Sequence, residues 1–342
     1  MPAIQEIQVD LTELLQGPAI ATAQDSAVSA KLIVPCRNVL GEGIIYNPST
    51  ECVLWTDIMG YCLYKLDLNE GQGRLCKFEM PKKVGSIGLV ATEQQQADTL
   101  PILCAWEDGF QLYDVENERG LSEKSTGEDV NPAKGPTRLN DGKTDPTGAR
   151  FICGGYYGEQ KGTKMKVYKV EQRDGKLVHE PIVEDMEVTN SISWSMDGKT
   201  MYLADSPSKQ IYSYDYDPQT GNVSNKKLVH TKSEPEGGVP DGTCVDVEGY
   251  LWNAVWRAGA GPAMVQRIDP STGNVVFTVN MPDSTSQVTC CCFGGKDLDI
   301  LFITSAAEGR DKAVEPNAGA LYGVKLPFKG KQEAKLNFSV GP

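Results

Sequence analysis

The sequence predicts an all-β protein, a single six-bladed β-propeller, on three observations. A short apolar pair recurs six times at intervals of 48 to 50 residues. A second apolar run of strand length follows each pair, and turns rich in Asp, Gly and Pro separate the runs. Units of about fifty residues with several strands each are typical of propeller blades around a channel, whereas a β-sandwich would need this spacing by coincidence. The six pairs are Leu54-Trp55, Ile102-Leu103, Phe151-Ile152, Met201-Tyr202, Leu251-Trp252 and Leu301-Phe302.

The repeat divides the chain into an N-terminal extension, residues 1–30, and a propeller, residues 31–342. In the extension, Asp10 before the run LTELLQ, with Glu13 three positions on, predicts the N-cap of a short helix. Residues 31–36 (KLIVPC) are apolar enough to add a strand to the last blade. Such a strand would close the ring without leaving a free sheet edge.

The amino-acid composition limits the kinds of partner that the protein can bind. The chain has 342 residues and a net charge of -13, so it offers no basic surface for nucleic acid, and a cation is a better-matched ligand. No apolar stretch reaches the length of about 18 residues that a membrane span needs, and the first residues are acidic where a signal peptide is basic. We therefore predict a cytoplasmic protein without membrane contact, as a monomer or a small homo-oligomer.

Cysteine and histidine usage argues against several kinds of site. The ten cysteines contain no C-x-x-C pair, which favours reduced and mostly buried thiols. The two histidines, His179 and His230, lie in polar, loop-like segments. A His-rich zinc site and a Ser-His-Asp triad are both disfavoured by these numbers.

Four polar residues stand at nearly the same phase of the repeat, ten to twelve residues before an apolar pair: Glu42, Asn140, Asn190 and Asp241. If this phase begins the innermost strand of each blade, the four side chains meet on the channel axis. Two carboxylates and two amides suit a hard cation such as calcium or magnesium, and other divalent ions are not excluded. Taken singly, Asn140-Asp141-Gly142 and Pro240-Asp241-Gly242 are also ordinary turn sequences.

Three segments carry a family resemblance: LGEGIIYNPSTECVLWTDIMG, RLNDGKTDPTGARFICGGYYGE and PDGTCVDVEGYLWNAVW. They resemble the regucalcin, gluconolactonase and luciferin-regenerating enzyme family, and the resemblance covers roughly residues 35–325. It implies a six-bladed propeller with one divalent metal ion in the central channel, held by Glu42, Asn190 and Asp241. Calcium is the first choice for this ion, with zinc, magnesium and manganese as alternatives.

The resemblance also implies substrate contacts and a reaction. Arg138 and Asn140 would bind the oxygens of the substrate, and Glu159 would hydrogen-bond its hydroxyls. The implied activity is metal-dependent hydrolysis of a small lactone, in which the cation polarises the carbonyl and Asp241 is both ligand and proton acceptor. Tyr156-Tyr157 stands where other members often have smaller or aliphatic residues, so the substrate does not follow from the resemblance.

Three other functions are compatible with the same pattern. The fold and metal could serve hydrolysis of a phosphoester or organophosphate, calcium binding without turnover in a regulatory protein, or a non-catalytic scaffold. The presence of Arg138, Asn140 and Glu159 beside the predicted ligands favours an enzyme, because a metal buffer does not need them.

Overall fold

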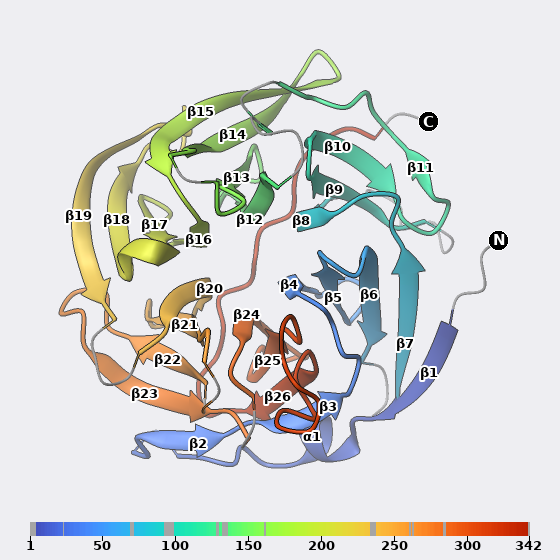
Figure 1. The fold of residues 1–342 in the computed structure, drawn as a ribbon, viewed down its shortest axis with the longest axis vertical. Helices are drawn as coiled ribbons and strands as arrows, with labels where there is room; N and C mark the ends of the chain where they lie inside the picture. Colours follow the sequence, from blue (N-terminus) through green and yellow to red (C-terminus); the bar gives the residue numbers. More distant parts are fainter. Residues whose placement is uncertain are drawn as a thin grey trace.

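Six β-sheets stand radially around a central channel, which confirms the predicted six-bladed propeller (Figure 1). The structure is a computed structural model, and it describes residues 5–22, 24–68, 72–91, 99–127, 130–131, 136–160, 162–232, 237–259, 261, 263–282 and 285–340. Residues 1–4 of the predicted extension lie outside these ranges. No helix among the described residues is long and apolar enough to cross a membrane.

In each blade the strands follow one another from the channel to the rim. The innermost strands are β4 (Gly41–Asn47), β8 (Val84–Leu89), β12 (Arg138–Thr144), β16 (Thr189–Trp194), β20 (Val239–Val245) and β24 (Val288–Gly294). The second strands are β5 (Cys52–Asp57), β9 (Pro101–Trp106), β13 (Phe151–Tyr156), β17 (Thr200–Asp205), β21 (Leu251–Trp256) and β25 (Ile300–Ser305). The third strands are β6 (Cys62–Asp67), β10 (Gly109–Asp114), β14 (Met165–Arg173), β18 (Gln210–Tyr216), β22 (Met264–Ile268) and β26 (Leu321–Lys325). Every predicted apolar pair lies in a second strand, and every apolar run that follows a pair is a third strand.

The outermost strands show how the ring closes. Five of them come from the same repeat as their blade: β7 (Gln72–Glu79), β11 (Arg119–Gly120), β15 (Lys176–Met186), β19 (Val223–Thr231) and β23 (Val275–Asn280). The sixth, β3 (Lys31–Val34), comes from the start of the chain and pairs antiparallel with β26. The predicted closing strand is therefore confirmed over its first four residues.

The N-terminal segment extends two blades. The strand β1 (Gln5–Asp10) pairs antiparallel with β7, and β2 (Ala27–Ser29) pairs parallel with β23. Each added strand covers the outer strand of its blade and becomes the edge strand of a five-stranded sheet.

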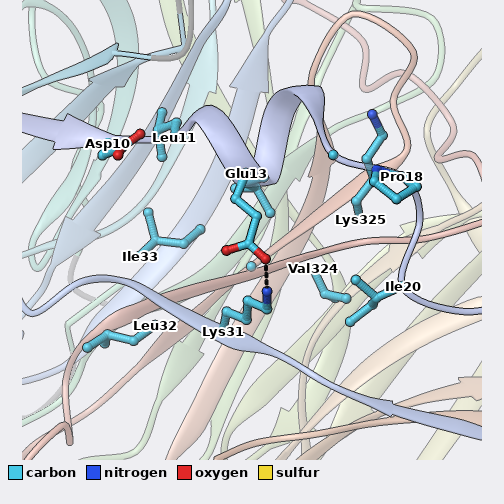
Figure 2. A pocket seen from close by; sticks show the side chains of 13 residues that line it. Asp10, Leu11, Glu13, Pro18, Ile20, Lys31, Leu32, Ile33, Val324 and Lys325 are labelled. Atoms are coloured by element: carbon cyan, nitrogen blue, oxygen red, sulfur yellow. Dashed lines mark hydrogen bonds and ion pairs between the residues drawn. The ribbon is translucent and has the colours of Figure 1, made fainter.

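One short helix, α1 (Thr12–Gln16), lies over β3 and β26 and borders a small pocket of about 200 Å³ (Figure 2). The N-cap is Leu11, so the prediction of Asp10 is wrong by one residue. Asp10 Oδ1 still accepts a hydrogen bond from the N–H of Thr12, the first residue of the helix, at 2.9 Å. The ion pair between Glu13 and Lys31 is largely exposed. It therefore contributes little to stability.

The core lies between the blades. Among the described residues, the buried apolar side chains form six clusters, and each cluster joins two neighbouring blades. Alternate residues of a strand point to opposite faces of the sheet, so both faces of a blade are buried by its neighbours. We number the blades 1 to 6 by their innermost strands, from β4 to β24. Trp252 of blade 5, for example, packs edge-on against Phe293 of blade 6 with ring centroids 5.3 Å apart. All ten cysteines are free thiols and nine are buried, as predicted.

A C-terminal strap, residues 326–340, crosses the end of the channel at which the inner strands finish (Figure 1). Its backbone N–H groups bond to carbonyls at the ends of inner strands, as in Lys331 N–H to Val245 and Leu336 N–H to Leu89. Within the channel, Lys143 Nζ of β12 donates to Glu333 Oε1 of the strap at 2.8 Å and to the Thr243 carbonyl of β20 at 2.9 Å. The strap thus ties several blades together at this end.

Candidate active site at one end of the channel

The inner strands begin at the other end of the channel, and each carries a β-bulge near its start. In β20 the pairing with β21 passes from Pro240 to Thr243, so Asp241 lies in the unpaired part of the strand. A bulge turns side chains away from the direction that regular pleating gives them. The two sequences that resembled turns, at Asn140-Asp141-Gly142 and Pro240-Asp241-Gly242, therefore lie within strands, and the interpretation as simple turns is wrong.

The structure brings all six sequence-predicted site residues to one pocket of about 440 Å³ at this end. Five of them are buried at its base, and Glu159 is exposed at its rim. The buried five are Glu42, Arg138, Asn140, Asn190 and Asp241. They come from β4, β12, β16 and β20, so residues about fifty positions apart converge because they occupy equivalent places in their blades.

Hydrogen bonds fix the orientation of the two amides. Asn140 Nδ2 donates to the Thr189 carbonyl at 2.8 Å and to Asn190 Oδ1 at 3.1 Å. Asn190 Nδ2 donates to Ser206 Oγ at 2.8 Å, and Ser206 Oγ donates to the Pro240 carbonyl at 2.7 Å. Since the Nδ2 of Asn190 is engaged on Ser206, its Oδ1 is the atom left to face the other pocket residues.

Positive charge compensates the two predicted carboxyl ligands only in part: the charge of Arg138 lowers the pKa of Glu42, but larger effects outweigh it. Burial, followed by the charge of Asp141, raises the pKa of Glu42 to about 8. Burial, followed by the charges of Glu42 and Asp141, raises the pKa of Asp241 well above its usual range. The Asp241 Oδ1 atom is buried and has no hydrogen-bond partner. Such an orphaned oxygen is costly unless a ligand meets it.

These observations test whether the residues fit a metal ion. No group of three or more His, Cys, Asp or Glu side chains in the described part of the chain is arranged to hold a metal. The donors here are instead two carboxylates and a fixed amide oxygen, which is the oxygen-rich chemistry that calcium and magnesium prefer. The orphaned Asp241 oxygen and the repelling carboxyls make Glu42, Asn190 and Asp241 fit a hard divalent cation.

Arg138 is the buried positive group at the base of the pocket. Its Nη1 donates to the Leu139 carbonyl at 3.1 Å and to Asn140 Oδ1, and its guanidinium lies over the Tyr156 ring, 4.7 Å from the centroid. Burial lowers the pKa of Arg138, although the charge of Glu42 opposes this shift. The side chain is 7% exposed and forms no ion pair with a described residue, which leaves donors for an oxygen-bearing ligand.

Three further residues shape the pocket and were not predicted from the sequence. Ser206, the first residue of the 3₁₀ turn Ser206–Ser208 after β17, orients Asn190. Asp141, interpreted only as a turn residue, is buried, and its Oδ2 accepts the Ile192 N–H at 3.0 Å, which links β12 to β16. Trp256, at the end of β21, lines the wall. Trp256 ends a second strand as Tyr156 does, so comparing that phase of the repeat would have found Trp256.

Fold and pocket together define a six-bladed β-propeller with a polar pocket at one end of its channel. Residues 40–307 match the model of the SMP-30/Gluconolactonase/LRE-like region, and the chain belongs to this family. It is 32% identical over 310 residues to a Bacillus subtilis (strain 168) protein named "Putative sugar lactone lactonase YvrE", with 89% of this chain and 97% of that protein covered. It is 31% identical over 324 residues to regucalcin of Gallus gallus, with 89% and 100% covered. A solved structure of a calcium-binding protein, regucalcin, from Agrobacterium tumefaciens superposes with a TM-score of 0.76 at 25% identity, and 92% of this chain and 99% of that chain are covered.

A divalent ion should stabilise the folded protein, because it would supply the positive charge that the buried carboxyls of Glu42 and Asp241 need in order to ionise. A ligand that binds only the folded state adds roughly 2.7 kcal/mol to the free energy of unfolding at a hundred times its dissociation constant. We expect thermal melts in calcium to have a higher midpoint than melts in a chelator. The double variant Glu42→Gln, Asp241→Asn is the control and should lose this difference. Equal midpoints for the wild type in calcium, magnesium, manganese, zinc and chelator would contradict a metal site.

The pH dependence in chelator is a second readout of the same carboxyls. The folded protein keeps a proton on Glu42 up to a pKa of about 8, whereas the unfolded chain releases it near 4.5. The folded state therefore binds more protons between these values, and its free energy of unfolding falls as the pH rises through them. Relative to Glu42→Gln, the wild type should lose stability from pH 5 to pH 8. Parallel pH profiles for the two proteins would contradict the raised pKa of this buried carboxyl.

Proposed function

We propose that this protein is a hydrolase that opens a small lactone in the pocket at the channel end, with one divalent metal ion held by Glu42, Asn190 and Asp241. The observation that carries the proposal is the meeting of an orphaned carboxylate oxygen, a second buried carboxyl and a buried arginine without an ion pair in one pocket. Membership of a family that includes gluconolactonases, and a relative named as a sugar lactone lactonase, support a lactone as the substrate class. Calcium is the first candidate for the ion, since the regucalcin structure is described as a calcium-binding protein.

The residues divide the reaction between them. When bound, the divalent ion supplies Lewis-acid polarisation of the lactone carbonyl and positive charge that keeps the nearby carboxyls ionised. Arg138, fixed by the Leu139 carbonyl and by Asn140, orients the substrate oxygens. Asp241 takes a proton from the attacking water as the new C–O bond forms. It returns that proton to the ring oxygen as the acyl C–O bond breaks, which releases a hydroxy acid.

Glu159 has a different position from the other five residues. It follows β13 in a left-handed conformation with φ 55° and is exposed at the pocket rim. The pKa of Tyr156 is raised to about 12, mainly by burial and next by the charge of the nearby Glu159 carboxylate. We therefore assign to Glu159 a contact with the outer part of a substrate and no part in the bond-breaking step.

Hydrolysis of a lactone panel tests the proposal directly. Sugar lactones and aliphatic lactones are offered to the purified protein with calcium, magnesium, manganese or zinc, and acid release is followed with a pH indicator. We expect turnover with at least one ion and none in excess chelator. Turnover of phosphoesters but of no lactone would replace the lactonase by the phosphoester hydrolase. Ion-dependent stabilisation without turnover of any ester would favour a calcium-binding protein.

A further inference from the structure

The pocket has a polar base and an apolar wall. Its base consists of the five buried polar residues described above, which come from inner strands. Above them the lining changes to half-buried apolar and aromatic side chains near the ends of second strands and the starts of inner strands. The main wall residues are Leu40, Met59, Tyr156, Tyr157, Val239 and Trp256. A ligand that fills this pocket has its polar end at the base and its other end against the wall.

The aromatic part of the wall is held in place. Tyr156 and Tyr157 meet edge to face, with ring centroids 5.6 Å apart, and Tyr156 also lies under the Arg138 guanidinium. The Tyr157 N–H donates to the Glu187 carbonyl at 2.9 Å, which fixes the backbone of this corner. Trp256 stands on blade 5, whereas the two tyrosines stand on blade 3. The packed tyrosine pair offers an apolar surface at little cost in side-chain entropy, and the Trp256 ring extends that surface to a second blade.

The charged groups at the pocket rim are poorly placed to hydrogen-bond a polar substrate that lies against the apolar wall. The Glu159 carboxylate lies near the Tyr156 hydroxyl, and its charge raises the pKa of Tyr156 after burial does. Lys83 Nζ lies 3.9 Å from Glu107 Oε2, and Glu308 is exposed. A polyhydroxylated ring needs hydrogen-bond partners around most of its edge, because each buried hydroxyl without a partner costs free energy. The aliphatic wall residues Leu40, Met59 and Val239 have no such partner to give.

We infer that the substrate is a lactone with an apolar substituent, which lies against the wall of Tyr157 and Trp256 while the lactone group occupies the polar base. This inference rests on the proposed function. A polyhydroxylated sugar lactone is then a poorer substrate than an alkyl lactone of similar size. Each methylene group that the wall covers should raise kcat/KM about fourfold, which corresponds to about 0.8 kcal/mol.

The test measures kcat/KM for γ-lactones with side chains of increasing length, from γ-butyrolactone upward, and for glucono-δ-lactone. We expect kcat/KM to rise with chain length and to exceed that for glucono-δ-lactone. Tyr157→Ala and Trp256→Ala should each reduce the ratio of kcat/KM for a long-chain lactone to that for γ-butyrolactone by about tenfold. Tyr157→Phe keeps the ring and should keep the ratio. Leu228→Ala, on the exposed face of β19, is the surface control and should also keep it.

A binding experiment separates this inference from the proposed function. γ-Alkyl lactams, which resist hydrolysis, are titrated into the ion-loaded protein by calorimetry. Affinity that rises with chain length, and that Trp256→Ala weakens, supports the apolar wall even if no lactone is turned over. Turnover that is fastest for glucono-δ-lactone, or lactam affinity independent of chain length, overturns the inference and leaves the lactonase proposal standing.

Discussion

Replacing Asp241 by Asn should lower lactone hydrolysis by about 10² to 10⁴ in kcat, the range that general-base catalysis typically contributes. The change keeps the size of the side chain and one oxygen, so the bulge in β20 and the fold should survive. It removes the charge that attracts the cation and the group that accepts the proton. The measurement is kcat at several metal concentrations up to saturation, with circular dichroism to confirm folding.

Saturating metal separates the two roles of Asp241. Weaker binding of the ion is overcome by excess metal, whereas a missing proton acceptor is not. If excess metal restores full turnover, Asp241 is a ligand only, and the base is another group. Asn190→Asp offers a matched control, because it adds a carboxylate at the equivalent place in the neighbouring blade and should not abolish metal binding.

Replacing Glu333 by Gln should lower the free energy of unfolding by about 3 kcal/mol, because it leaves the Lys143 ammonium in the channel without its counter-ion. Burial alone would lower the pKa of Lys143, but the Glu333 carboxylate reverses this and raises it. The side chains of Lys143 and Glu333 are only 12% and 21% exposed, so water compensates little for the lost charge. Chemical denaturation followed by fluorescence measures the change.

Two control variants test whether the loss of stability comes from the buried ion pair. Asp297→Asn removes the partner of Lys329, a strap residue in an exposed ion pair, and should cost less than about 0.5 kcal/mol. The double variant Lys143→Met, Glu333→Leu replaces both charges by apolar groups and should regain most of the lost stability. If Asp297→Asn and Glu333→Gln lower the free energy of unfolding equally, the buried pair stabilises the protein no more than the exposed pair does.

The repeat made much of this molecule predictable. Apolar pairs at a constant interval gave the blades, and the shared phase of Glu42, Asn140, Asn190 and Asp241 placed them in one pocket, because equivalent positions in a propeller have equivalent radii. Their roles as ligands and catalyst remain predictions. Ser206 and the strap residue Glu333 were not found, since they lie outside the repeating strands and act through partners far away in sequence. The bulges were not found either, because a bulge depends on the register of the neighbouring strand.

Ring closure by β3 has a consequence for how the chain folds. The strand β3 is synthesised early, but its partner β26 comes later than every other strand. The ring therefore stays open during synthesis until nearly the whole propeller has left the ribosome, and pairing across such a sequence separation is slow. Glu42 follows β3 closely, whereas Asp241 belongs to blade 5, so the two carboxylates are brought face to face as the last blade is inserted. Partly made chains then carry the halves of the pocket without the pocket itself, and we expect the proposed hydrolysis only from chains whose ring has closed.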